Sequence, residues 1–227
     1  MKNGSTFTFG AALLALGALL FTPTHADAQE RASARGWNWY HGTDTMKLDA
    51  SEKTLLARYL NKKCLVQKMA SPKRAFFADA VRHINSVLGD PKFVSMVKAK
   101  RDWFDSRDSG AKILSAAMRG ETVNVFIYER EDGYPCSGTD VADGHTNAFT
   151  PRVGADMLFV YDPYLEKQMR ERDHRELART VIHEGMHALG YSHNAKVGTK
   201  QYNNSVPVYV GCLVERWGTS AVNNCGK

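Results

Sequence analysis

The chain has 227 residues, of which 43% are hydrophobic and 24% are charged, and its formal net charge is +6. This composition is that of an ordinary globular protein. It excludes collagen, a coiled coil and a disordered tail, because each of these needs a strong compositional bias. No block of about five or six like charges occurs, so the basic excess does not indicate binding to nucleic acid or to a membrane surface. The composition predicts one globular domain and no nucleic-acid partner.

The N-terminal segment has the layout of an export signal. Lys2 supplies a positive charge, an apolar run covers 10–21, and Ala26-Asp27-Ala28 provides the small-x-small pattern that signal peptidase reads. The apolar run is shorter than the roughly 20 residues that a membrane-spanning helix needs. We therefore expect a cleaved signal peptide at 1–28, a single domain over 29–227 without a membrane span, and a secreted or periplasmic location.

Export changes the interpretation of the cysteines. Cys64, Cys136, Cys212 and Cys225 all lie in the mature part of the chain. An even number of cysteines in an oxidising compartment favours two disulfides, although three connectivities are open. We favour Cys212 with Cys225, which closes a short loop, and this leaves Cys64 with Cys136.

Helical patterns dominate the first half of the mature chain. A polar and aromatic segment over 31–49 comes first and is an entry segment or a short strand. Apolar residues then recur on one helical face, and prolines occupy positions at which helices begin. The sequence predicts helices near residues 51–69, 72–88, 91–104 and 109–119.

The pattern changes to that of strands further along the chain. Residues 122–128 (TVNVFIY) and 155–161 (ADMLFVY) are short runs rich in β-branched and aromatic side chains, so we expect two buried strands. A loop over 132–151 separates them, and loops of this length are often functional. Helical spacing then predicts a helix over 166–189 that is broken near Asp173. Residues 206–217 are predicted to form a last helix or strand. The expected class is α+β, with several N-terminal helices and a small mixed sheet.

The stretch HEGMHALGYSH, residues 183–193, contains the candidate metal-binding and catalytic residues. His183 and His187 are four residues apart on a predicted helix, so both imidazoles project from one face within reach of one metal ion. Gly190 can adopt a positive φ and end the helix, which returns His193 toward the same metal. Three imidazoles leave the fourth position of a tetrahedral zinc ion open, as in catalytic sites. Glu184 lies beside that face and can accept a proton from a water molecule that the metal acidifies.

The third ligand has one alternative. No aspartate occurs beyond Asp173, which excludes zinc sites that use an aspartate after the helix. Glu215 is the only acidic residue after Glu184, so a carboxylate ligand would have to be Glu215. Glu215 lies 28 residues past His187 and is better explained as a charge on the terminal segment that pairs with Arg216 or a neighbour, so His193 is favoured.

The stretch resembles the zinc signature H-E-x-x-H-x-x-G-x-x-H of the metzincin metallopeptidases. The resemblance implies a zincin-like fold with an active-site helix, one catalytic Zn²⁺ held by His183, His187 and His193, and Glu184 as general base and proton shuttle. Metzincins also have a methionine-containing turn downstream, whereas the last methionine here is Met186. Either another residue, such as one in 205–211, takes that packing role, or the chain is a divergent zincin outside the metzincin family proper.

The implied activity is that of an exported zinc-dependent metalloendopeptidase acting on a protein or peptide substrate. In the zincins that the chain resembles, substrate lies along an edge strand, for which 156–161 and the loop before it are candidates. Tyr209 and Tyr202 are candidates for donating a hydrogen bond to the developing oxyanion. Two alternatives stay open: a secreted zinc-binding protein or effector without turnover, and a peptidoglycan-peptide amidase that uses the same site.

Overall fold

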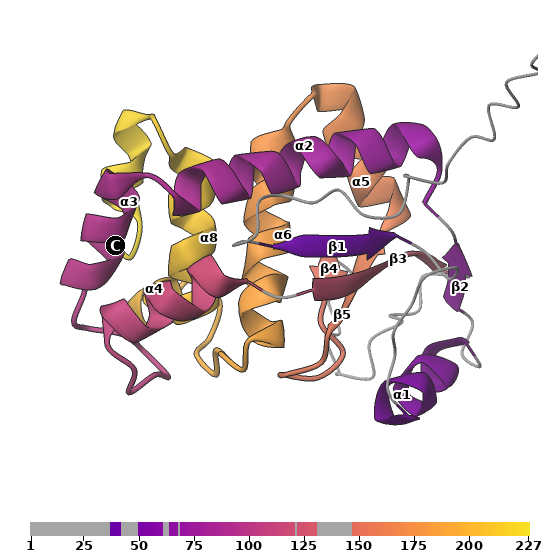
Figure 1. Ribbon diagram of the computed structural model, residues 1–227, viewed down its shortest axis with the longest axis horizontal. Helices are drawn as coiled ribbons and strands as arrows, with labels where there is room; N and C mark the ends of the chain where they lie inside the picture. Colours follow the sequence, from indigo (N-terminus) through magenta and orange to yellow (C-terminus); the bar gives the residue numbers. More distant parts are fainter. Residues whose placement is uncertain (1–36, 42–49, 61–63, 68, 121, 131–146) are drawn as a thin grey trace, which may run out of the picture.

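A computed structural model of the chain describes residues 37–41, 50–60, 64–67, 69–120, 122–130 and 147–227. The predicted signal peptide at 1–28 lies outside these residues. A mixed sheet and a set of helices form the described part, so the predicted α+β class is confirmed (Figure 1). No helix within the ranges given above has the length and apolar character needed to cross a membrane.

The sheet has five strands in the order β1-β3-β5-β4, with β2 also paired to β3. β3 runs parallel to β1 and to β5, whereas β2 and β4 are antiparallel to their neighbours. The two expected strands are confirmed as β3 and β5, and β4 is an addition within the region expected to be a loop. The strands are β1 Asn38–His41, β2 Cys64–Gln67, β3 Thr122–Arg130, β4 Ala148–Phe149 and β5 Met157–Tyr161.

Within the described residues, four helices precede β3, as expected, but the bounds of two differ from the prediction. The predicted helix over 51–69 is wrong in its second half, because residues 64–67 form β2 and pair their backbone with β3. The predicted helix over 91–104 ends at Ala99, and Phe104 instead forms a bridge with Ser205. In both places pairing with a distant segment overrides local helical spacing. The helices are α1 Ala50–Leu60, α2 Ser71–Leu88, α3 Pro91–Ala99 and α4 Gly110–Arg119.

The C-terminal half is mostly helical. The expected break near Asp173 is confirmed, because the Asp173 side chain accepts a hydrogen bond from the backbone N–H of Glu176 and begins a new helix. Residues 206–217, expected as a helix or a strand, form a helix. The elements are α5 Asp162–Glu171, α6 His174–Ala188, α7 Lys200–Asn203, α8 Val206–Arg216 and the 3₁₀ helix η1 Ser220–Asn224.

The helix α6 has a central position in the fold. It contacts β4 and β5 on one side and α8 on another, and α2 also packs against it (Figure 1). Its apolar face, which includes Leu177, Val181 and Ile182, is fully buried in the core. Because α6 is held on several sides, the side chains at its C-terminal end have a rigid support.

One disulfide fixes the C-terminal segment to this framework. Cys212 of α8 is bonded to Cys225 with a sulfur–sulfur distance of 2.10 Å, which confirms the predicted pair. The predicted partnership of Cys64 with Cys136 lies outside the described side chains.

Candidate metal centre

Three histidines converge at the C-terminal end of α6. His183 and His187 project from one face of the helix, as their spacing predicts. Gly190 has a φ of 96°, a conformation that favours glycine, and it lies just beyond the end of the helix. The chain turns back there and brings His193 to the two helical histidines, which confirms that the three side chains lie together.

The separations between the histidine nitrogens fit one metal ion. The Nε2 atom of His193 lies 3.1 Å from that of His183 and 3.2 Å from that of His187. Nitrogens bound tetrahedrally to a zinc ion at about 2.0–2.1 Å are about 3.3 Å from each other. Among the residues that the structure describes, no other group of His, Cys, Asp or Glu side chains converges in this way.

The histidines are held in the form that binds a metal. The Nδ1 atom of His187 lies 2.7 Å from the carbonyl oxygen of Tyr191, so it donates its hydrogen there and leaves Nε2 with a free lone pair. Burial, with a smaller contribution from the nearby His193, lowers the pKa of His187 to about 4 against the opposing effect of the Tyr191 hydrogen bond. Burial also lowers the pKa of His183 and of His193. The imidazoles are therefore neutral near pH 7, and a metal ion need not displace protons from them.

Glu184 lies beside the histidines with its two carboxylate oxygens in different environments. Oε2 accepts a hydrogen bond of 2.7 Å from the backbone N–H of Thr150, at the end of β4. Oε1 lies 4.0 Å from Nε2 of His183, on the side of the metal ligands. Burial raises the pKa of Glu184 to about 8, and the hydrogen bonds with Thr150 act in the opposite direction. One oxygen is thus anchored, and the other faces the place where a metal would bind.

Trp37 supports the helix beneath Glu184. Its side chain is fully buried, and its Nε1–H donates to the carbonyl oxygen of Ala117 at 3.0 Å. A Cβ atom added to Gly185 would lie 2.8 Å from two carbons of the Trp37 ring. Gly185 is therefore required by the close approach of the indole to α6.

We expect Gly185→Ala to destabilise the protein by about 1–3 kcal/mol, because the added methyl group overlaps a ring that is fixed by its own hydrogen bond. The free energy of unfolding, measured in urea, checks this. Gly89→Ala is the matched control, since a Cβ at Gly89 meets only ordinary contacts of 3.6 Å and longer. Equal stability of the two variants would contradict the packing role of Trp37.

Asp105 holds the loop that carries the third histidine. Its carboxylate accepts a hydrogen bond of 2.6 Å from the backbone N–H of Asn194, the residue after His193. Asp105 has a φ of 60°, which is uncommon outside glycine and marks a backbone held in place by its surroundings. Close by, the Tyr191 hydroxyl donates to Asp108 at 3.2 Å. The segment after α3 thus fixes the ligand loop, as outer-shell carboxylates do in metal sites.

We expect Asp105→Gly to weaken zinc affinity about 10- to 100-fold, because the variant keeps a backbone suited to positive φ but loses the carboxylate. Asp105→Asn retains an acceptor oxygen and should lose much less affinity. Competition against a chromogenic chelator measures the zinc dissociation constant of each variant. Unchanged affinity in the glycine variant would show that Asp105 does not position His193.

The two tyrosine candidates have different surroundings. The Tyr202 ring packs edge-on against His193, with 4.9 Å between ring centroids. Tyr209 instead packs against Trp103 at 5.4 Å, and none of the three histidines is among its ring contacts. Burial raises the pKa of both phenols, and the charge of Glu184 contributes to the rise at Tyr202. The structure therefore brings Tyr202, rather than Tyr209, to the metal centre.

The remaining candidates can also be placed. Glu215, the alternative third ligand, lies 3.5 Å from the Arg179 guanidinium and is not part of the histidine group. The segment 205–211 begins α8 and packs on α6, where a Cβ at Gly211 would lie 3.6 Å from Cβ of His183. A closely packed helix thus supports the first histidine from behind.

Comparison of the chain with models of protein families, with curated proteins and with solved structures finds no match.

Proposed function

We propose that the protein is an exported zinc-dependent metalloendopeptidase. The observation that carries the proposal is the convergence of three neutral histidine nitrogens beside a buried carboxylate that has one oxygen directed toward them. Three protein nitrogens leave a position open for a reactant, whereas structural zinc sites close with four protein ligands and favour cysteine. When bound, zinc would supply Lewis acidity, which acidifies a water molecule and polarises a carbonyl oxygen.

Glu184 carries out the proton transfers in the proposed reaction. Its free oxygen accepts the proton of the attacking water, and the same carboxyl group then gives that proton to the departing amine nitrogen. The Thr150 N–H keeps the carboxylate in one orientation during both transfers. Because the Tyr202 ring packs against His193, we assign its hydroxyl as the donor to the oxygen of the former carbonyl group as negative charge develops on it.

The sheet offers an edge for an extended substrate. Of the two expected candidates, 156–161 contains β5, which lies between β3 and β4, so that expectation is corrected. The loop before it, the other candidate, contains β4. β4 stands at the end of the strand order, and its last residue is followed by Thr150, which contacts Glu184. We infer that a substrate peptide adds to β4 as a further strand, with its scissile bond near Glu184.

Tyr202 and Tyr209 form a matched pair for testing oxyanion stabilisation. We expect Tyr202→Phe to lower kcat about 10²-fold with little change in KM, since the lost donor acts mainly in the transition state. Tyr209→Phe should leave kcat within about twofold, because its ring contacts Trp103 instead. Equal losses in the two variants, measured by steady-state kinetics, would contradict this assignment.

An assay with casein and with cell-wall peptides, run with and without a chelator, tests the proposed function. Hydrolysis of casein that stops on chelation and returns with zinc is the expected result. Hydrolysis of the cell-wall peptides alone would identify the amidase, which shares the same site chemistry. Stoichiometric zinc without turnover of either substrate would identify a zinc-binding effector and overturn the proposal.

A further inference from the structure

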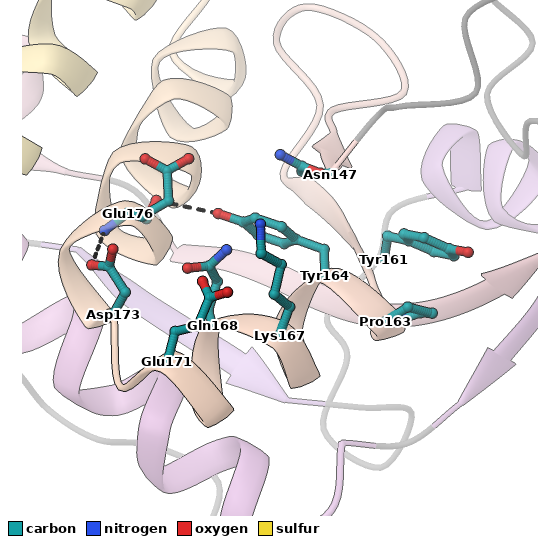
Figure 2. Close-up of a pocket in the computed structure, with 9 residues that line it drawn as sticks. All are labelled: Asn147, Tyr161, Pro163, Tyr164, Lys167, Gln168, Glu171, Asp173 and Glu176. Carbon is teal, nitrogen blue, oxygen red and sulfur yellow. Dashed lines mark hydrogen bonds between the residues drawn. The ribbon is translucent and has the colours of Figure 1, made fainter.

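An acidic cavity lies two helical turns from the metal centre. It has a volume of about 470 Å³ and is formed by α5, the start of α6 and the adjoining ends of β4 and β5 (Figure 2). Three carboxylates line it, against one ammonium group from Lys167. The carboxylates belong to Glu171, Asp173 and Glu176. The local charge is therefore negative, although the chain as a whole is basic.

The cavity also contains hydrogen-bonding capacity that the described residues do not use. Gln168 lines it and is only 3% exposed, yet its Oε1 has no hydrogen-bond partner within the described ranges. A buried acceptor without a donor costs free energy, so such atoms call for an explanation. Burial raises the pKa of Glu176, and the charges of Glu215 and Asp173 add to the rise against the effect of Arg179. The Glu176 carboxylate is already paired with the Arg179 guanidinium at 2.7 Å. The Gln168 oxygen is therefore the group that a cationic donor would satisfy.

Two elements, α6 and the β4 segment, each run from the cavity to the metal centre. Glu176 and His183 are seven residues apart on one face of α6, which corresponds to about 10 Å. Asn147 lines the cavity and Thr150 contacts Glu184, and these two residues of the β4 segment are also about 10 Å apart. The cavity thus lies beside the start of β4, and the metal centre lies beside its end.

Among the described residues, no strand pairs with β4 on the side opposite β5, and a peptide could extend along that side between these two points. The carbonyl oxygen of Asn147 accepts from the Tyr161 N–H at 2.9 Å, so it faces β5. Because backbone groups alternate along an antiparallel strand, those of Ala148 face away from β5. An extended peptide paired there rises about 3.3 Å per residue, so three residues span the distance from the metal centre to the cavity.

We propose that this acidic cavity is a subsite for a lysine or arginine side chain of the substrate, three residues from the scissile bond. The inference rests on the proposed peptidase function. A cavity of this size is within the range of ligand pockets, and carboxylate and amide oxygens are the acceptors that an ammonium or guanidinium group requires. The Lys167 side chain also lines the cavity and is exposed to solvent (Figure 2).

Peptides with one fixed cleavage site test the proposal. Lys, Arg, norleucine or Glu is placed at the third residue on either side of the scissile bond. We expect kcat/KM for Lys or Arg to exceed that for Glu by about 10- to 100-fold on one side, because like charges repel in such a pocket. The variants Glu171→Gln and Glu171→Gln/Glu176→Gln should reduce this ratio stepwise while leaving cleavage of the norleucine peptide within about twofold.

Glu166→Gln is the control for the loss of a negative charge on α5, because Glu166 is paired with Lys73 outside the cavity. It should leave the ratio unchanged. Efficient cleavage of all peptides without a basic preference, or a preference that survives in the double variant, would overturn the subsite alone. Failure to cleave any peptide would overturn the proposed function and the subsite together. Thermal unfolding of each variant separates lost selectivity from lost folding.

Discussion

Glu184→Gln is expected to retain zinc at one ion per chain and to lose peptide hydrolysis by on the order of 10²–10⁴-fold. The substitution keeps the size of the side chain and an oxygen that can accept from the Thr150 N–H. It removes the group that takes a proton from water and returns it to the leaving amine. Steady-state kinetics and metal analysis of the same preparation measure the two properties separately.

The stability of this variant provides a control for correct folding. The pKa of Glu184 is raised by burial to about 8 in the metal-free protein, from an unfolded value near 4.5. Between these values the folded state holds more protons than the unfolded state, so the contribution of Glu184 to stability falls as pH rises. The metal-free glutamine variant should therefore be at least as stable as the wild type at pH 7. A variant that loses both zinc and stability would contradict a purely chemical role for Glu184.

His183→Ala/His187→Ala is expected to abolish stoichiometric zinc binding, because only one of the three converging nitrogens remains. Zinc at about 100 times its Kd should stabilise the wild type by about 2.7 kcal/mol and should not stabilise the double variant. The thermal midpoint with and without zinc measures this difference.

The matched control is His174→Ala, which removes a histidine from the first position of the same helix. It should keep both the zinc content and the zinc-dependent rise in the thermal midpoint. Full zinc content in the double variant would show that the metal lies elsewhere.

The convergence of the three histidines could be predicted from the sequence because it depends on local geometry. Helical spacing places His183 and His187 on one face, and a glycine that ends the helix returns the chain to His193. The break at Asp173 was predictable for the same reason, since a capping side chain acts on the next turn of its own helix.

The groups that surround the ligands could not be predicted in this way. Asp105 reaches the loop that carries His193 across 89 residues, and Thr150, which follows the two-residue strand β4, reaches Glu184 across 34 residues. The contact of Trp37 with Gly185 likewise joins segments far apart in the chain. No periodicity connects such positions, because tertiary packing alone brings them together. The choice of Tyr202 over Tyr209 also depended on which face of the C-terminal segment meets His193.

Zinc content and peptide hydrolysis, measured on one sample of the wild-type protein before and after chelation, test the central claim most directly. The account predicts one zinc ion per chain, hydrolysis that disappears when the ion is removed, and recovery of both on adding zinc back. Hydrolysis that persists in the metal-free protein, or folded protein that takes up no zinc, would contradict it.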